Sequence, residues 1–370
     1  MKHLFSGRFA GRAPNALSLF FGTGHNTSVY NIDMNKNGFL ISAKGICIAA
    51  FLSLNTVIHA QKTENISTIS EKTLSSILEK NRTYYTQGKV ADYIPELGKM
   101  DATAIAFSVV DKNGKVFNTG DVHKKFTMQS ISKIIALMIA VSERGEANVF
   151  DKIGYFGSEK PFNHFANLET TGKPLNPMMN AGAILTTSLI SGEGEKPFLK
   201  ILDMVRYITK NQTIDYNTSV YESEKSTGHR NRGMFYLMKN NGLISGNEDQ
   251  LDNYFKQCSI ELTAEDLAKI GYFFANQCTR FDGDSTYKNV EIARLIESQM
   301  LTAGMYEFSG EYARTVGLPS KSGVGGGITV SVPGKMGIGV FSPALDQHGN
   351  SSAGYHMILD FVKQYNLSLF

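Results

Sequence analysis

A serine and a lysine stand three residues apart in the stretch FTMQSISKIIALMIA, at the start of a long apolar run. A serine hydroxyl becomes a useful nucleophile when a neighbouring base takes its proton. Residues i and i+3 share one helical face, so we expect Ser130 and Lys133 to approach within hydrogen-bonding reach. Burial beside the apolar run would lower the lysine pKa and make it a base. The alternative is a polar helix start whose lysine reaches out to water.

A second motif strengthens the chemical interpretation. Lys321-Ser322-Gly323 precedes three consecutive glycines and an apolar strand. A Lys-Ser/Thr-Gly triplet on an edge strand, combined with a helical Ser-x-x-Lys, is typical of penicillin-recognising serine hydrolases. Glycine lets a substrate approach the backbone, so an N–H near Val324 would complete an oxyanion hole with that of Ser130. A second Ser-x-x-Lys, at residues 285–288, lies in a polar loop and is interpreted as incidental.

Polar and aromatic residues also gather in blocks between these two motifs. The blocks KPLNPMMNAGAI, SEKSTGHRN, DNYFKQCSIELT and MYEFSG contain Asn180, Glu224 with Asn231, Tyr254 and Tyr306. Glu224 and Asn231 are two helical turns apart and would share a face if their segment is one helix. Taken singly, each residue also fits a helix cap, an ion pair or a half-buried core position.

Together, QSISK, these blocks, DYIPELG and the longer run MYEFSGEYARTVGLPSKSGVGGGI resemble the serine-dependent glutaminase family over residues 68–365. The resemblance implies a β-lactamase-like fold and hydrolysis of L-glutamine to L-glutamate and ammonia, without a metal or cofactor. It makes Ser130 the nucleophile, Lys133 its base, and the backbone of Ser130 and Val324 the oxyanion hole. It also implies a homodimer or homotetramer.

The resemblance further implies how the substrate is held. A free amino acid carries both charges of a zwitterion, so its site needs an anion and several neutral donors. The implied contacts with the α-carboxylate are Asn180, Asn231 and Tyr254, those with the α-ammonium are Glu224 and Gln129, and Tyr93 and Tyr306 line the same pocket. Either Tyr254 or Tyr306 is implied as a proton relay, and the sequence does not choose between them.

Two alternatives remain open at this level. A penicillin-recognising hydrolase or transpeptidase would share both motifs, although a β-lactam has no obligatory α-ammonium for Glu224 to neutralise. A non-catalytic amino-acid-binding relative would keep the pocket and lose turnover. Retention of both Ser130 and Lys133 argues against that second alternative.

The pattern of apolar residues predicts an α/β (α+β) fold. The sequence predicts these elements: a helix over 67–82, a hairpin over 102–121 with its turn at 111–114, a helix over 126–141, helices within 183–210 and 262–276, two strands around Pro333-Gly334, and a helix over 356–365. Thr263 with Asp266 resembles a capping box. We therefore expect an antiparallel sheet built from residues 61–125 and 315–370, flanked by terminal helices, beside a helical lobe over about 126–314.

The first sixty residues differ from the rest in containing an uncharged apolar segment typical of a targeting sequence. Residues 45–58, GICIAAFLSLNTVI, are apolar and uncharged, with Lys44 before them and Ala60 after them. A basic flank, a short apolar core and a small residue predict a secretory signal cleaved after Ala60, with Met34 as its start. The catalytic domain would then be 61–370 and the protein periplasmic or secreted, without a stable membrane anchor. The alternatives are an uncleaved extension or interfacial anchor and, by the resemblance, a cytoplasmic enzyme.

Charge and cysteine content exclude other classes. The net charge of +3 comes from 37 basic and 34 acidic residues without a long basic run, so a nucleic-acid-binding surface is not expected. Cys47 lies in the predicted signal, and Cys258 and Cys278 show no metal-binding spacing. We expect these two to be unrelated buried thiols, with a disulfide as the alternative in an exported protein.

Overall fold

The central sheet is built from two distant parts of the chain. In the computed structural model, which describes residues 69–164 and 166–370, its strands are β2 (Ala106–Val110), β3 (Val116–Gly120), β6 (Ser320–Ser322), β7 (Gly327–Val332) and β8 (Met336–Phe341). They are antiparallel and follow the order β3-β2-β8-β7-β6. The predicted antiparallel sheet and both hairpins are confirmed. β6, which carries Lys321 and Ser322, lies at the sheet edge as expected.

Helices and short strands make up the rest of the described chain. The α-helices are α2 (Glu71–Asn81), α3 (Ser132–Arg144), α4 (Glu146–Phe150), α5 (Ala166–Thr170), α6 (Asn180–Leu189), α7 (Lys196–Thr209), α8 (Thr218–Thr227), α9 (His229–Asn240), α10 (Asp249–Cys258), α11 (Ala264–Ala275), α12 (Val290–Ala303), α13 (Ser309–Thr315) and α14 (Ser352–Tyr365). The 3₁₀ turns are η1 (Arg82–Gln87), η2 (Leu97–Lys99), η3 (Gln129–Ile131) and η4 (Tyr306–Phe308). Two further strand pairs join β1 (Lys89–Val90) to β9 (Ala344–Leu345) and β4 (Phe126–Thr127) to β5 (Glu261–Leu262).

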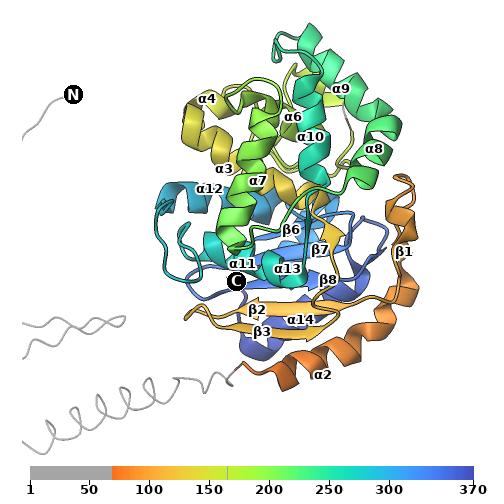
Figure 1. The fold of residues 1–370 in the computed structure, drawn as a ribbon, viewed down its shortest axis with the longest axis vertical. Coiled ribbons are helices and arrows are strands. Elements are labelled where there is room, and N and C mark those ends of the chain that lie inside the picture. The colour runs from red at the N-terminus through yellow and green to blue at the C-terminus, as the bar shows by residue number, and fades with distance from the viewer. Residues whose placement is uncertain (1–68, 165) are drawn as a thin grey trace, which may run out of the picture. The chain divides into compact units, whose positions relative to one another are not determined.

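The two faces of the sheet are covered by different helices. On one face, α2 and α14 pack with residues such as Leu78, Phe107, Val340 and Phe361 into one buried cluster. On the other face, α11 lies directly against β8, β7 and β2. Figure 1 shows α2 and α14 below the sheet and the lobe helices above it. The helices predicted at both ends therefore flank the sheet, as expected.

Close backbone contact explains why α11 sits so tightly on the sheet. A Cβ atom added at Gly339 of β8 would lie 2.1 Å from the carbonyl oxygen of Ala264, and one added at Gly271 of α11 would lie 2.2 Å from that of Val330. Such distances leave no room for a side chain, so these glycines allow α11 to approach. The predicted capping box of Thr263 and Asp266 is present at the start of this helix.

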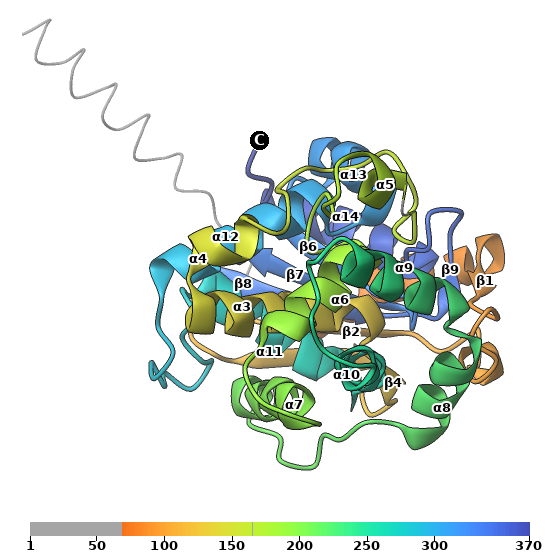
Figure 2. The same cartoon turned by 90° about the horizontal axis from the view of Figure 1, so that it is seen from above.

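The helix α3 forms the centre of the lobe, where it packs against α6, α7 and α12 (Figure 2). Residues 132–141 are all buried, as the apolar run predicts. The predicted start at residue 126 is wrong. Phe126 and Thr127 instead pair with Leu262 and Glu261, and a 3₁₀ turn over Gln129–Ile131 precedes the α-helix. Strand pairing holds this segment extended, so Ser130 lies in the turn before α3.

The segment containing Glu224 and Asn231 also differs from the expectation. It is divided at Gly228, which separates α8 from α9. A Cβ added at Gly228 would lie 2.6 Å from the ring of Phe255, so the chain passes α10 very closely at this point. Glu224 and Asn231 therefore do not share the face of one helix.

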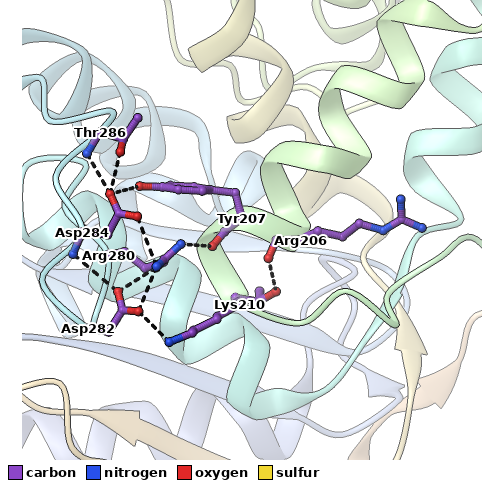
Figure 3. Close-up of polar contacts among 8 residues, drawn as sticks. Arg206, Tyr207, Lys210, Arg280, Asp282, Asp284 and Thr286 are labelled. Atoms are coloured by element: carbon purple, nitrogen blue, oxygen red, sulfur yellow. Dashed lines mark hydrogen bonds and ion pairs between the residues drawn. The ribbon is translucent and has the colours of Figure 1, made fainter.

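The loop between α11 and α12 is tied to the end of α7 by charged groups (Figure 3). Asp282 accepts from Arg280 at 2.7 Å and pairs with Lys210 at 3.1 Å, and the Tyr207 hydroxyl donates to Asp284 at 2.8 Å. These contacts fix the loop that carries the second Ser-x-x-Lys, and its Ser285 is exposed. This loop lies outside the pocket described below, in agreement with the interpretation of that motif as incidental.

The apolar segment of residues 45–58 lies outside the described residues, and so do the predicted signal and its cleavage site. Among residues 69–164 and 166–370, no helix is long and apolar enough to cross a membrane.

Candidate active site

A polar pocket brings together most of the residues singled out in the sequence. It encloses about 580 Å³ including its open mouth. The predicted residues that line it are Tyr93, Gln129, Ser130, Asn180, Glu224, Asn231, Tyr254 and Val324. Lys133 and Tyr306 lie behind this lining and contact its members. Residues from the sheet edge, the turn before α3 and four lobe helices therefore meet at one place.

The turn that carries Ser130 has an unusual backbone. Gln129 has a φ of 50°, in the left-handed region that non-glycine residues seldom adopt. The Ser132 hydroxyl donates to the Gln129 carbonyl at 2.8 Å, and the Gln257 amide donates to that hydroxyl at 3.3 Å. Backbone conformations of this kind persist where the surroundings hold them, and they cluster at functional sites. Here the held turn places the hydroxyl of Ser130 in the pocket wall.

Lys133 is almost completely buried, with 1% of its surface exposed. Its Nζ donates to the carbonyl oxygen of Met178 at 2.9 Å and to Asn180 Oδ1 at 2.8 Å. Burial lowers the pKa of Lys133 to about 8, as the sequence predicts for a base. The expected direct contact is not formed, because no hydrogen bond joins Lys133 Nζ to Ser130 Oγ among the described residues. The amine of Lys133 is instead directed to Met178 and Asn180, while Ser130 lies in the 3₁₀ turn before α3.

The two residues whose backbone amides are expected to form an oxyanion hole, Ser130 and Val324, both line the pocket. Among the hydrogen bonds of residues 69–164 and 166–370, none is donated by the backbone N–H of Ser130 or of Val324. Val324 lies in the glycine-rich loop after β6, and this loop touches the turn before α3. A Cβ added at Gly323 would lie 2.4 Å from the carbonyl oxygen of Met128. The contact fixes the two amide-bearing segments against each other.

The acidic end of the pocket is formed by Glu224. This side chain is buried, and its Oε2 atom has no hydrogen-bond partner among the described residues. Burial raises the pKa of Glu224 to about 8, and the Gln129 side chain and the charge of Lys133 oppose that rise. Asn180 Nδ2 donates to Asn231 Oδ1 at 3.0 Å beside it. A buried carboxyl oxygen without a partner is costly, so this end of the pocket is suited to a cation.

The three predicted tyrosines occupy different positions. Tyr93 lies at the rim with 56% of its surface exposed. The pKa of its phenol is raised well above 10, mainly because the hydroxyl end is buried and secondarily because the charge of Glu224 is near. Tyr254 lines the interior and hydrogen-bonds to Cys258. Tyr306 donates to the carbonyl of Ser322 at 3.2 Å and has a side-chain hydrogen bond with Ser130, while burial raises its pKa. Tyr306 is therefore the tyrosine in contact with the serine.

Several residues of the lining do not stand out in the sequence. They are Ile94, Phe162, Asn163, Thr227, Gly228, Arg230 and Cys258. Cys258 was detectable, because it lies one turn after Tyr254 on α10 and so faces the same way. Phe162 and Asn163 come from a proline-broken loop without a periodic pattern. Cys258 and Cys278 are both free and buried, which confirms the expectation of two unrelated thiols.

The antiparallel sheet, the helical lobe beside it and the polar pocket at the sheet edge define a protein of the β-lactamase-like fold. Known proteins are similar to this chain in both fold and sequence. The family model for glutaminase matches residues 88–370. A glutaminase of Clostridium botulinum is 48% identical over 306 residues, which cover 80% of this chain and 99% of the relative.

Solved structures agree with the sequence matches. A probable glutaminase from Bacillus subtilis, complexed with 6-diazo-5-oxo-L-norleucine, has a TM-score of 0.75 and 33% identity, covering 82% of this chain and 97% of its own. A covalent complex of a Bacillus subtilis glutaminase with 5-oxo-L-norleucine, formed by reaction with 6-diazo-5-oxo-L-norleucine, has a TM-score of 0.73 and 33% identity, covering 80% of this chain and 99% of its own. The chain belongs to the glutaminase family and is an amidohydrolase acting on glutamine. This membership favours glutamine hydrolysis over the penicillin-recognising alternative.

Proposed function

We propose that the protein hydrolyses L-glutamine to L-glutamate and ammonia, with Ser130 as nucleophile and Lys133 as its base. The main observation behind the proposal is that one pocket has a nucleophile near a base at one end and a carboxyl group at the other. A serine near a buried base of lowered pKa stands at one end, and a buried carboxyl group with one unpartnered oxygen stands at the other. An amino acid with a side-chain amide matches both ends.

Substrate recognition follows from the groups at the acidic end. The ionised Glu224 carboxylate pairs with the α-ammonium, and the Gln129 side chain lies beside them. Asn180, Asn231 and Tyr254 supply neutral N–H and O–H donors for the α-carboxylate. These contacts hold glutamine by its backbone groups, so the side-chain amide extends towards Ser130.

Acylation begins with a proton transfer. A neutral lysine amine has two N–H bonds, and Lys133 has two acceptors for them in Met178 and Asn180. Its lone pair is then available to take the proton of Ser130 when the two side chains approach each other in the substrate complex, as Oγ bonds to the amide carbon. The N–H groups of Ser130 and Val324 stabilise the oxyanion. The C–N bond breaks, and ammonia leaves with the proton that Lys133 has taken.

Deacylation repeats the sequence with water. Lys133 removes a proton from water, the water oxygen bonds to the acyl carbon, and the bond to Ser130 Oγ breaks to release glutamate. The hydroxyl of Tyr306 is in contact with Ser130, which supports Tyr306 over Tyr254 as the relay that returns a proton to Oγ.

Covalent labelling tests the assignment of the nucleophile. A relative of known structure reacts covalently with 6-diazo-5-oxo-L-norleucine. We expect this reagent to label the wild-type protein on Ser130, as located by peptide mass spectrometry, and to leave Ser130→Ala unlabelled. Ser285→Ala, in the exposed second Ser-x-x-Lys, is the matched control and should be labelled like the wild type. A label on another residue would contradict the assignment.

We further propose that the protein is exported after cleavage behind Ala60 and that it forms a homodimer or homotetramer. The proposal of export is supported by the apolar segment 45–58 and its basic flank, and the proposal of an oligomer by family membership. N-terminal sequencing should give Gln61 as the first residue, and light scattering should give two or four times the mass of the chain. An intact N-terminus or a monomer would contradict these proposals.

A further inference from the structure

Lys321 is a second buried lysine beside the pocket. None of its surface is exposed, and the ion pairs of residues 69–164 and 166–370 do not include it. Its Nζ donates to the carbonyl oxygens of Ser322 at 2.6 Å and Gly304 at 3.0 Å, and lies 4.5 Å from the centre of the Tyr306 ring. A buried amine without a carboxylate partner is costly. Its position therefore indicates that Lys321 acts through the two carbonyl groups to which it donates.

The Ser322 carbonyl is the point where these contacts converge. It accepts from Lys321 Nζ and also from the Tyr306 hydroxyl at 3.2 Å. The Ser322 N–H donates to Gly304 at 3.1 Å, so the carbonyl of Gly304 also receives two donors. The pKa of Lys321 lies well below 10.5, mainly because the amine is buried and secondarily because the charge of Lys133 is near. A neutral amine has two N–H bonds, which matches these two acceptors.

The chain after Ser322 leads directly to the candidate oxyanion hole. Gly323 and Gly325 press against the turn before α3, since a Cβ at either would lie 2.4 Å from the carbonyl oxygen of Met128 or Thr127. The loop is thus held on one side by this contact. On the other side it is held through the Ser322 carbonyl, two residues before the N–H of Val324.

We propose that Lys321 is a positioning residue that fixes the Ser322 carbonyl and thereby directs the Val324 N–H at the substrate oxyanion. The inference rests on the proposed role of Ser130 and Val324. Lys321 itself does not line the pocket, so it acts without touching the substrate. Loss of its amine should weaken stabilisation of the transition state while leaving the contacts with the ends of glutamine in place.

The test compares Lys321→Met with the wild type. Methionine keeps the apolar stem and removes the N–H donors, so kcat for glutamine should fall about 10- to 100-fold while KM stays within about threefold. The maximal rate of inactivation by 6-diazo-5-oxo-L-norleucine should fall similarly, at an unchanged half-saturating concentration. Lys256→Met is the matched control: Lys256 is also buried but pairs with Glu195 outside the pocket, and its loss should leave kcat unchanged.

A second variant covers the case in which Lys321→Met does not fold. Lys321→Gln keeps N–H donors in a smaller side chain. If Lys321→Met folds, the kcat of Lys321→Gln should lie between those of the wild type and Lys321→Met. If Lys321→Met is unfolded, the kcat of Lys321→Gln should still lie below that of the wild type.

The opposite results overturn the inference. A folded Lys321→Met or Lys321→Gln with wild-type kcat, or with a raised KM and unchanged kcat, would show that Lys321 does not position the oxyanion hole. Ser130→Ala separates this failure from that of the proposed function. An inactive Ser130→Ala beside a fully active Lys321→Met rejects only the role of Lys321, whereas an active Ser130→Ala rejects the function on which it rests.

Discussion

At the scale of single residues, Lys133 and Glu224 form an unusual pair. Burial disfavours the charged form of each group, so it lowers the pKa of the lysine and raises that of the carboxyl group, in both cases to about 8. The proposed reaction needs the lysine neutral as a base and the carboxyl group ionised as the partner of the α-ammonium. Both requirements are met above the shifted pKa values.

This pair predicts the acid limb of the pH profile. Below pH 8, two protons must leave the free enzyme before it can act, so log(kcat/KM) should rise with pH at a slope that approaches 2. The two groups interact, so the limb reports apparent pKa values of the pair. In Glu224→Gln the slope should fall to 1, because only the lysine proton remains. A slope of 1 in the wild type, or no change in the variant, would contradict the pairing.

Glu224→Gln also tests how the substrate is held. Removing the carboxylate should raise KM for glutamine at least about tenfold, because a charge-assisted contact with the α-ammonium contributes roughly 1.5–3 kcal/mol. The loss should be much smaller for an analogue that lacks the α-amino group. An unchanged KM, measured by steady-state ammonia release, would argue that Glu224 does not contact the substrate.

At the scale of elements, the glycine loop after β6 and the turn before α3 form one catalytic unit, although 190 or so residues separate them in the chain. Their close contact requires the absence of a side chain at Gly323. Thr187 of α6, Gln257 of α10 and Ser132 at the start of α3 support the same turn from the lobe. All three are completely buried and hydrogen-bonded in series.

Gly323→Ala should separate the loop from the turn. Its Cβ would lie 2.4 Å from the carbonyl oxygen of Met128, so one segment has to move. We expect kcat to fall at least about tenfold, since displacements of about 1 Å at a catalytic site have effects of this size. Gly310→Ala, on the exposed side of α13 with no atom within 4 Å, is the control. It should keep full activity and raise stability by about 0.5–1 kcal/mol.

The support from α6 can be tested with adjacent threonines. Thr186 and Thr187 are both buried, and each donates to the carbonyl four residues earlier, at 2.8 Å and 2.9 Å. Only Thr187 also bonds to Gln257, at 2.9 Å. Thr187→Val leaves that amide oxygen buried without a partner and should reduce the free energy of unfolding by about 1–3 kcal/mol. Thr186→Val should lose less in urea denaturation; equal losses would argue against the network.

At the scale of the whole molecule, the sequence predicts the sheet well because its strands are bounded by strong turn signals. The hairpin turns at Asp111–Gly114 and Pro333-Gly334 and the edge position of Lys321-Ser322 follow from local patterns. The start of α3 does not, because β4 is held extended by a distant partner in β5. The break at Gly228 likewise results from close packing against Phe255 of α10, which local spacing does not reveal.

The same contrast holds for the candidate site. Residues in distinctive blocks, such as Asn180, Glu224 and Tyr254, were found from their chemistry and the resemblance. The left-handed backbone of Gln129 and the unpartnered oxygen of Glu224 depend on tertiary contacts. So does the convergence of Lys321 and Tyr306 on one carbonyl. Spacing along the chain carries no information about these features.

The buried cysteines give a test of the whole fold. Burial raises the pKa of Cys278 to about 12 and that of Cys258 well above 9, so little thiolate is present at neutral pH. A protein of residues 61–370 should react very slowly with a thiol reagent when native and show two thiols in denaturant. Absence of thiols in denaturant would indicate the alternative disulfide.

The proposed function depends above all on nucleophilic attack by Ser130 in this pocket. The most direct measurement is the rate of ammonia release from glutamine by the wild type, Ser130→Ala and the control Ser285→Ala. We expect activity in the wild type and in Ser285→Ala, and a loss in kcat of at least about 10³-fold in Ser130→Ala, as found when a nucleophile is removed. A folded Ser130→Ala that releases ammonia at the wild-type rate would contradict the account.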